Sequence, residues 1–228
     1  MPAFEIDALV FDVLGTLVDE PAGIRAAVGD LAPSLADDLV RRWLDHVEQE
    51  QRRIADGDRP YADSEVLDRE AAQLVADAAG TGDAAALVAA ARRPPAWPDT
   101  VAGLARLAGR FPLIGLSNAS RTGLLRLNAH AGLRWHQALS AADAQAYKPD
   151  PSVYGLAVAA SGGPPERLLM VAAHAWDLRG ARDVGLRTAY VARPVGDPPL
   201  PSDGFDLYAE GLDDLADQLG VPSRLADG

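Results

Sequence analysis

Four short apolar runs are the feature of this 228-residue sequence that most restricts its fold. They cover residues 8–12, 113–117, 168–172 and 188–192, and segments with helical patterns separate them. Continuous apolar runs of this length, alternating with helices, are typical of buried parallel strands. The sequence therefore predicts an α/β fold whose core is a Rossmann-like parallel sheet.

Polar residues follow the first three runs directly. Asp12 ends the first run, Ser117 and Asn118 end the second, and His174 and Asp177 follow the third. Because the carboxyl ends of parallel strands meet at one edge of an open sheet, these side chains are expected to lie close together. The sequence thus predicts an active site at that edge.

Residues 20–93 have a different pattern, with three predicted helices and no convincing strand. These helices cover residues 35–55, 64–79 and 83–91, and the acidic residues of the segment are expected to form a solvated face. We therefore predict a core domain of residues 1–19 and 94–228, with residues 20–93 inserted as an all-helical cap. Further helices are predicted over residues 101–109, 121–131, 152–160, 178–184 and 212–219. The rest of the tail after Pro194 is predicted to be loop.

Composition excludes several classes of protein. The 33 acidic and 21 basic residues give a net charge of −12, which disfavours nucleic acid and anionic membranes as partners. There is no cysteine, so disulfide scaffolds and thiolate chemistry are excluded. No apolar stretch of membrane-spanning length and no basic leader occurs, and a cytoplasmic protein is expected. Lys148 is the only lysine, which indicates a role that arginine does not fill.

The ordered motifs resemble those of the haloacid dehalogenase superfamily. The first motif, Asp-x-x-Gly-Thr-Leu, stands here as residues 12–17, and Ser117-Asn118 matches the second. The runs Tyr-Lys-Pro-Asp-Pro-Ser-Val-Tyr (147–154) and Val-Ala-Ala-His-Ala-Trp-Asp (171–177) match the later motifs. The resemblance covers nearly the whole chain and includes a helical cap between the first two motifs.

Within that superfamily, two differences distinguish this chain from the phosphatases. Phosphatases carry a second aspartate two residues after the nucleophile and hold magnesium with acids around a later Gly-Asp pair. Here Leu14 and the pair Ala172-Ala173 stand at those positions. A halide leaving group needs neither a proton nor a metal. The chain therefore resembles the type II (S)-2-haloacid dehalogenase branch, and no cofactor or metal is expected.

The resemblance implies a two-step hydrolysis of short 2-haloalkanoic acids to 2-hydroxy acids. An oxygen of Asp12 displaces the halide from the carbon beside the substrate carboxylate, and water then hydrolyses the aspartyl ester. The implied catalytic residues are Asp12, Lys148, Asp177 and Thr16. The implied substrate-binding residues are Ser117, Asn118, Leu14, Arg42, Trp43, Tyr154, His174 and Trp176.

One departure concerns the leaving-group pocket. Relatives usually carry an arginine directly after a tryptophan in the first cap helix, but Leu44 follows Trp43 here, and Arg41 and Arg42 precede it. His174 also replaces an asparagine found in many dehalogenases. Three alternatives therefore stay open: a hydrolase of another activated carbon next to a carboxylate, a phosphatase, and an inactive binding protein of the same fold. The resemblance is also compatible with a homodimer.

Overall fold

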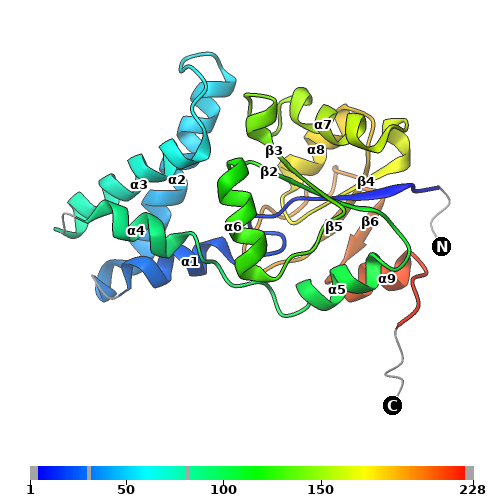
Figure 1. The fold of residues 1–228 in the computed structure, drawn as a ribbon, viewed down its shortest axis with the longest axis horizontal. Coiled ribbons are helices and arrows are strands. Elements are labelled where there is room, and N and C mark those ends of the chain that lie inside the picture. Colours follow the sequence, from blue (N-terminus) through cyan, green and yellow to red (C-terminus); the bar gives the residue numbers. More distant parts are fainter. Residues whose placement is uncertain (1–4, 30–31, 81–82, 224–228) are drawn as a thin grey trace.

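The computed structural model describes residues 5–29, 32–80 and 83–223, and a parallel six-stranded sheet forms its centre (Figure 1). The strand order is β3-β2-β1-β4-β5-β6, and every neighbouring pair is parallel. The strands are β1 (Ala8–Phe11), β2 (Leu113–Ser117), β3 (Gln137–Ser140), β4 (Leu168–Ala172), β5 (Arg187–Val191) and β6 (Leu207–Ala209). The first strand thus lies near the middle of the sheet, between β2 and β4.

Alternation along β1 divides the apolar core into two layers. Leu9 and Phe11 belong to one cluster of buried residues, and Ala8 and Val10 belong to the other. This period of two is that of a strand whose two faces are both covered. Helices α5 (Thr100–Leu107), α6 (Arg121–Ala131) and α9 (Leu212–Gln218) supply the first cluster, and α7 (Pro151–Ser161) and α8 (Ala175–Asp183) supply the second.

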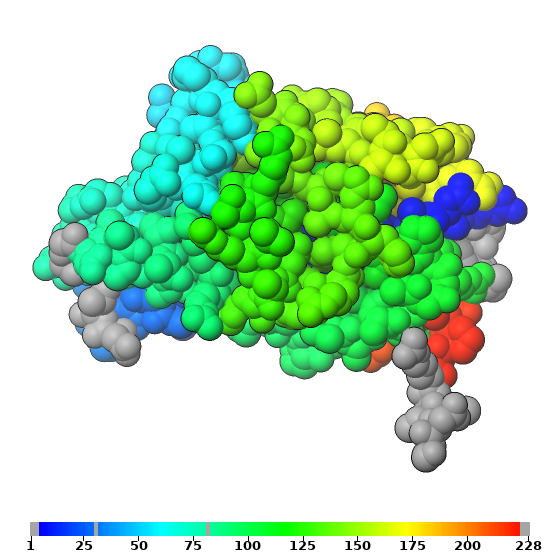
Figure 2. Space-filling model, in the orientation of Figure 1, coloured from blue at the N-terminus to red at the C-terminus, as the bar shows by residue number. Residues whose placement is uncertain are grey.

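Four further helices pack around an apolar core of their own. They are α1 (Glu20–Val28), α2 (Ala36–Ala55), α3 (Ser64–Ala79) and α4 (Ala84–Ala91), and we call them the helical unit. Their shared cluster includes Ile24, Trp43 and Val75. The helical unit projects to one side of the sheet (Figure 1), and its surface meets that of α6 (Figure 2).

The predicted α/β fold is confirmed. Two strands, β2 and β4, have the predicted limits. Strand β1 ends at Phe11, one residue before the predicted limit, and β5 lies at Arg187–Val191, one residue earlier than predicted. The two strands that the sequence did not reveal, β3 and β6, lie at the edges of the sheet. Their partly exposed side chains form no continuous apolar run, so the prediction of loop was wrong at β6. No helix within the described residues is long and apolar enough to cross a membrane.

Helix α5 packs so closely on α9 that one added methyl group would not fit between the two helices. A Cβ on Gly103 would lie 2.4 Å from the Cβ of Leu212. We expect Gly103→Ala to lower the free energy of unfolding by about 1–3 kcal/mol, because the helices must separate. Gly155→Ala is the control: no atom lies within 4 Å of its Cβ, and α7 should gain about 0.5–1 kcal/mol. Urea unfolding of both variants measures the difference, and equal stabilities would contradict the packing.

Candidate active site

Asp12 lies at the carboxyl end of β1, and both of its carboxylate oxygens accept hydrogen bonds. Thr16 Oγ1 donates to Oδ2 at 2.6 Å, and Lys148 Nζ donates to Oδ1 at 2.7 Å. The backbone N–H of Asp12 donates to the carbonyl of Val171 on β4 at 3.0 Å. These contacts hold the carboxylate in one orientation, as a nucleophile requires.

Lys148 joins Asp12 to a second buried carboxylate. Its Nζ also donates to Asp177 Oδ2 at 2.6 Å, and its side chain is only 1% exposed. Burial by itself would lower the pKa of this ammonium, but the two carboxylates outweigh that effect and hold the pKa above its ordinary value. Lys148 therefore stays positively charged throughout the neutral and mildly alkaline range.

Asp177 lies at the start of α8 and is fully buried. Tyr154 of α7 donates its hydroxyl to Asp177 Oδ1 at 2.7 Å and also contacts the Asp177 carbonyl at 3.0 Å. Burial raises the pKa of Asp177 even though Lys148 opposes that shift. The Tyr154 hydroxyl also has a raised pKa because it is buried, so it remains a donor. Tyr154 thus orients Asp177 through the hydrogen bonds of its hydroxyl.

The loop after Asp12 is held against the end of β4. The backbone N–H of Ala173 donates a hydrogen bond to Thr16 Oγ1 at 2.9 Å, and the Thr16 hydroxyl donates its own hydrogen bond to Asp12. Gly15 has φ +78°, and a Cβ there would lie 2.5 Å from Nε2 of His174. Only glycine therefore fits beneath this imidazole.

Three side chains form a wall beside that loop. His174 Nε2 lies 3.3 Å from the carbonyl oxygen of Leu14, and the His174 ring lies 5.8 Å from the ring of Trp176. All three are partly exposed. The structure therefore brings Leu14, His174 and Trp176 to the same edge of the sheet as Asp12.

Ser117 and Asn118 lie on the opposite side, at the end of β2. Asn118 Oδ1 accepts from the backbone N–H of Lys148 at 2.9 Å, and its Nδ2 donates to Gln51 Oε1 of α2 at 3.1 Å. Ser117 Oγ accepts from the N–H of Ala119 at 3.1 Å. Ser120, rather than this pair, caps α6, because its Oγ accepts from the N–H of Gly123.

Two predicted substrate-binding residues do not reach this cluster. Arg42 lies on the exposed side of α2, where it pairs with Asp38 at 2.6 Å. Trp43 is 3% exposed and belongs to the apolar core of the helical unit, against which Leu44 also packs. The prediction for both residues is corrected on this point: the amphipathic pattern of α2 turns Trp43 into that core and Arg42 toward solvent.

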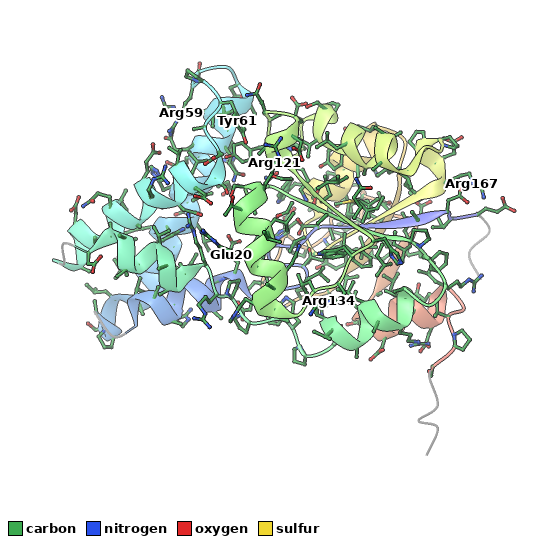
Figure 3. The ribbon with its side chains drawn as sticks, viewed as in Figure 1. Glu20, Arg59, Tyr61, Arg121, Arg134 and Arg167 are labelled. Atoms are coloured by element: carbon green, nitrogen blue, oxygen red, sulfur yellow. The ribbon has the colours of Figure 1, made fainter. Side chains whose placement is uncertain are left out.

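Two acidic residues of segment 20–93, which were predicted to lie on a solvated face, are only partly exposed. Glu20, which Figure 3 labels, is the first residue of α1 and is half-buried. Desolvation, with the charges of Asp68 and Asp12, raises the pKa of Glu20 to about 8. Burial likewise raises the pKa of Asp68 on α3 to about 6. The sequence feature that could have singled out Glu20 is its position, eight residues after Asp12 and beyond the Gly15-Thr16 turn.

The donor set does not fit a magnesium ion. The ammonium of Lys148 lies between the carboxylates of Asp12 and Asp177 and fills the place that a cation would take. Nowhere in the described ranges do three or more histidine and acidic side chains converge as a metal would require. We therefore derive no step through a metal.

Comparison with known proteins shows the family of this chain. The family model for haloacid dehalogenase-like hydrolases matches residues 6–185. The chain belongs to this family. An (S)-2-haloacid dehalogenase of Xanthobacter autotrophicus is 30% identical over 98% of this chain and 96% of its own length.

Solved structures extend the likeness to three dimensions. A crystal structure of an L-2-haloacid dehalogenase has a TM-score of 0.84 and 34% identity, and the match covers 95% of this chain and all of that one. The Xanthobacter autotrophicus L-2-haloacid dehalogenase with chloropropionic acid covalently bound has a TM-score of 0.82 and 26% identity. That match covers 96% of this chain and all of the other.

Glu20 yields a prediction for the pH dependence of stability. Its pKa rises from 4.5 to about 8 on folding, so between these values the unfolded chain loses the proton first. The wild-type free energy of unfolding should therefore fall with rising pH in this window, by at most about 1.4 kcal/mol per pH unit from this group. Glu20→Gln removes that decline, so its stability advantage should grow from about pH 5 to about pH 8.

Urea unfolding at three pH values across the window measures this effect. Glu48→Gln is the control, because the Glu48 side chain is 59% exposed on α2. An advantage of Glu20→Gln that stays constant with pH would show that Glu20 does not change its protonation on folding.

Proposed function

We propose that this protein hydrolyses short 2-haloalkanoic acids to 2-hydroxy acids through an ester of Asp12. The observation that carries the proposal is the buried ammonium of Lys148 between Asp12 and Asp177. This arrangement offers an oriented carboxylate and a positive charge that offsets the approach of an anionic substrate. The comparisons support it, because the relatives and solved structures described above are named as 2-haloacid dehalogenases.

In the first step, a carboxylate oxygen of Asp12 attacks the carbon that bears the halogen. The carbon–halogen bond breaks, the halide leaves with the bonding electron pair, and an aspartyl ester remains. No proton is required, so the absence of an acid at Leu14 does not hinder this step. Thr16 and Lys148 hold the attacking carboxylate in place.

In the second step, water attacks the carbonyl carbon of the Asp12 ester. Asp177 accepts the proton of the water, helped by its raised pKa. Thr16 Oγ1 and Lys148 Nζ stabilise the developing oxyanion. The intermediate then collapses, and the alkoxide of the 2-hydroxy acid leaves and takes the proton held by Asp177. The second proton of the attacking water is released to solvent, and the Asp12 carboxylate is restored.

The substrate carboxylate is proposed to bind beside Ser117 and Asn118. At the start of α6, the N–H groups of Arg121 and Thr122 are the ones proposed to donate to it, because those of Ala119, Ser120 and Gly123 already donate to Ser117, Ser64 and Ser120. Leu14, His174 and Trp176 would contact the carbon chain on the opposite wall. Tyr154 would act on the reaction only through Asp177.

We further propose that residues 20–93 act as the cap of this site, with residues 1–19 and 94–228 as its core. The hydrogen bonds from Asn118 to Gln51 and from the Ser120 N–H to Ser64 Oγ support this assignment, because they join the two parts beside the nucleophile. A homodimer and a cytoplasmic location remain part of the proposal.

A related hydrolase of another activated carbon next to a carboxylate is the second candidate. The observation that favours it is that leucine, and not arginine, stands at position 44, while Arg42 pairs with Asp38. Fluoride, chloride and bromide release from a panel of 2-haloacids, each assayed with and without a chelator, separates the two. Release of halide that chelator does not reduce supports the dehalogenase.

Isotope labelling tests the covalent intermediate. In a single turnover in ¹⁸O water, the 2-hydroxy acid should carry unlabelled oxygen, because that atom comes from Asp12. The label should enter the Asp12 carboxylate instead, where peptide mass spectrometry detects it. Heavy oxygen in the first-turnover product would mean that water attacks the substrate directly.

Replacement of the single lysine tests its geometry. Lys148→Arg keeps the charge, but the planar guanidinium is wider than the ammonium and does not fit between two oxygens that are 2.7 and 2.6 Å from one nitrogen. We expect kcat to fall by about 100-fold or more through displacement of Asp12. Arg52→Lys, an exposed exchange on α2, is the control. Retention of about a third of kcat by Lys148→Arg would place the ammonium outside the reaction.

A further inference from the structure

A buried arginine that follows β5 holds the backbone of Thr16. Arg193 lies two residues after the end of β5, and its Nε donates to the carbonyl oxygen of Thr16 at 2.8 Å. The Arg193 side chain is only 7% exposed. Because β5 neighbours β4 and β4 neighbours β1, the chain after β5 runs close to the loop that follows Asp12. Arg193 is therefore a buried cation that contacts this loop.

This contact adds a third hydrogen bond to Thr16. Its Oγ1 donates to Asp12 Oδ2 at 2.6 Å and accepts from the N–H of Ala173 at 2.9 Å. These two bonds set the direction of the hydroxyl, whereas the bond from Arg193 to the carbonyl sets the position of the Thr16 backbone. A shift of that backbone would move the hydroxyl relative to Asp12. The distance between Thr16 and the nucleophile therefore depends on Arg193.

The carbonyls on either side of Thr16 have donors of their own. Trp97 Nε1 donates to the Gly15 carbonyl at 3.0 Å, and Thr100 Oγ1 donates to the Leu17 carbonyl at 2.8 Å. Both of these donors are neutral and come from α5 or from the segment just before it. Since the neighbouring peptides stay held, loss of the Arg193 contact would release the Thr16 peptide without unfolding the loop.

The guanidinium of Arg193 is itself fixed by two residues. Its Nη1 donates to Asp99 Oδ2 at 3.0 Å, and the same oxygen accepts from the N–H of Leu212 at 2.8 Å. Its Cζ lies 6.0 Å from the centre of the Trp97 ring, at the range of cation–π attraction. The planar fork thus presents Nε to the loop and Nη1 to Asp99 at the same time. Lysine has a single nitrogen, which cannot occupy both positions.

We propose that Arg193 is a positioning residue for the reaction: through the Thr16 carbonyl, it keeps the Thr16 hydroxyl at hydrogen-bond distance from the Asp12 carboxylate. The inference rests on the proposed function, in which Thr16 takes part in both steps. Arg193 acts on the reaction only through Thr16, whereas the substrate carboxylate is proposed to bind beside Ser117 and Asn118. Its loss should therefore lower kcat and leave KM almost unchanged.

Arg193→Lys tests this role, because it keeps a positive charge beside Asp99 and loses the fork. We expect kcat for 2-chloropropionate to fall by about 10- to 100-fold and KM to change by less than about twofold. Arg106→Lys is the matched control. The Arg106 side chain is 11% exposed and also donates to backbone carbonyls, those of Pro222 and Asp213, but it holds α5 to α9 and the chain after α9. It should keep kcat within about twofold of the wild type.

Hydrogen exchange of the Ala173 amide measures the position of Thr16 without turnover. This N–H donates to Thr16 Oγ1, so its protection from exchange depends on where that hydroxyl lies. We expect NMR to show exchange that is about tenfold faster in Arg193→Lys than in the wild type, and unchanged in Arg106→Lys. If the wild type releases no halide, the proposed function fails, but the exchange rate of Ala173 still tests the positioning by Arg193.

Three results would overturn the inference. Retention of kcat within about twofold by Arg193→Lys would show that the reaction does not depend on this contact. Equal losses of kcat in Arg193→Lys and Arg106→Lys would assign the effect to a general loosening of the fold. Unchanged exchange of Ala173 in Arg193→Lys would show that Thr16 keeps its position without the arginine.

A second variant serves if Arg193→Lys does not fold. The double variant Arg193→Met with Asp99→Asn removes both charges of the buried pair, so neither charge is left without its partner. The same loss of kcat, unchanged KM and faster exchange of Ala173 are expected. A loss that appears in KM instead would assign Arg193 to substrate binding and contradict the proposal.

Discussion

The ammonium of Lys148, shared between two carboxylates, is the interaction on which the site depends. At an effective dielectric of about 20, two charges about 4 Å apart interact by about 4 kcal/mol, so Asp12 and Asp177 would repel each other strongly without it. Removal of one partner from a buried pair leaves an uncompensated charge and costs about 3–5 kcal/mol. The sheet brings the two carboxylates together because β1 and β4 are neighbours. Lys148 comes from the segment between β3 and α7, and Asn118 at the end of β2 holds its backbone N–H.

Around that ion group, the supporting contacts come mostly from backbone and neutral hydroxyls. Thr16 accepts a hydrogen bond from the Ala173 N–H and donates its hydroxyl to Asp12, and Tyr154 donates its hydroxyl to Asp177. Neutral donors hold a carboxylate in place without adding charge to a site that an anion must enter. This arrangement suits the proposed displacement, in which the charge only moves from oxygen to halide.

The sequence predicted the central strands and the polar edge because both depend on local patterns. Asp12, Lys148 and Asp177 were found from motif spacing, and the structure brings them within hydrogen-bond distance. Edge strands such as β6 were not predicted, because a strand that pairs on one side only does not need a long apolar run. Arg42 and Trp43 were misplaced because the orientation of a helix depends on its tertiary partners, which spacing alone does not specify.

The partial burial of Glu20 was missed for a related reason. An acid at a helix start is usually a favourable, solvated group. Whether it loses its water depends on which surfaces meet there, and only the packing of α1 and α3 against the core decides that. Cap boundaries at residues 19 and 94 remain a prediction, supported by the separate apolar core of α1 to α4.

The single amide of Asn118 has a kinetic consequence. It accepts from the backbone of Lys148 and donates to Gln51 of α2, so one planar group links the lysine to the helical unit. A swing of that unit, which in such proteins takes microseconds to milliseconds, must break or carry along this link. Release of the product and the return of Lys148 to its place would then depend on the same motion of the helical unit. A change that slows this motion would also slow turnover.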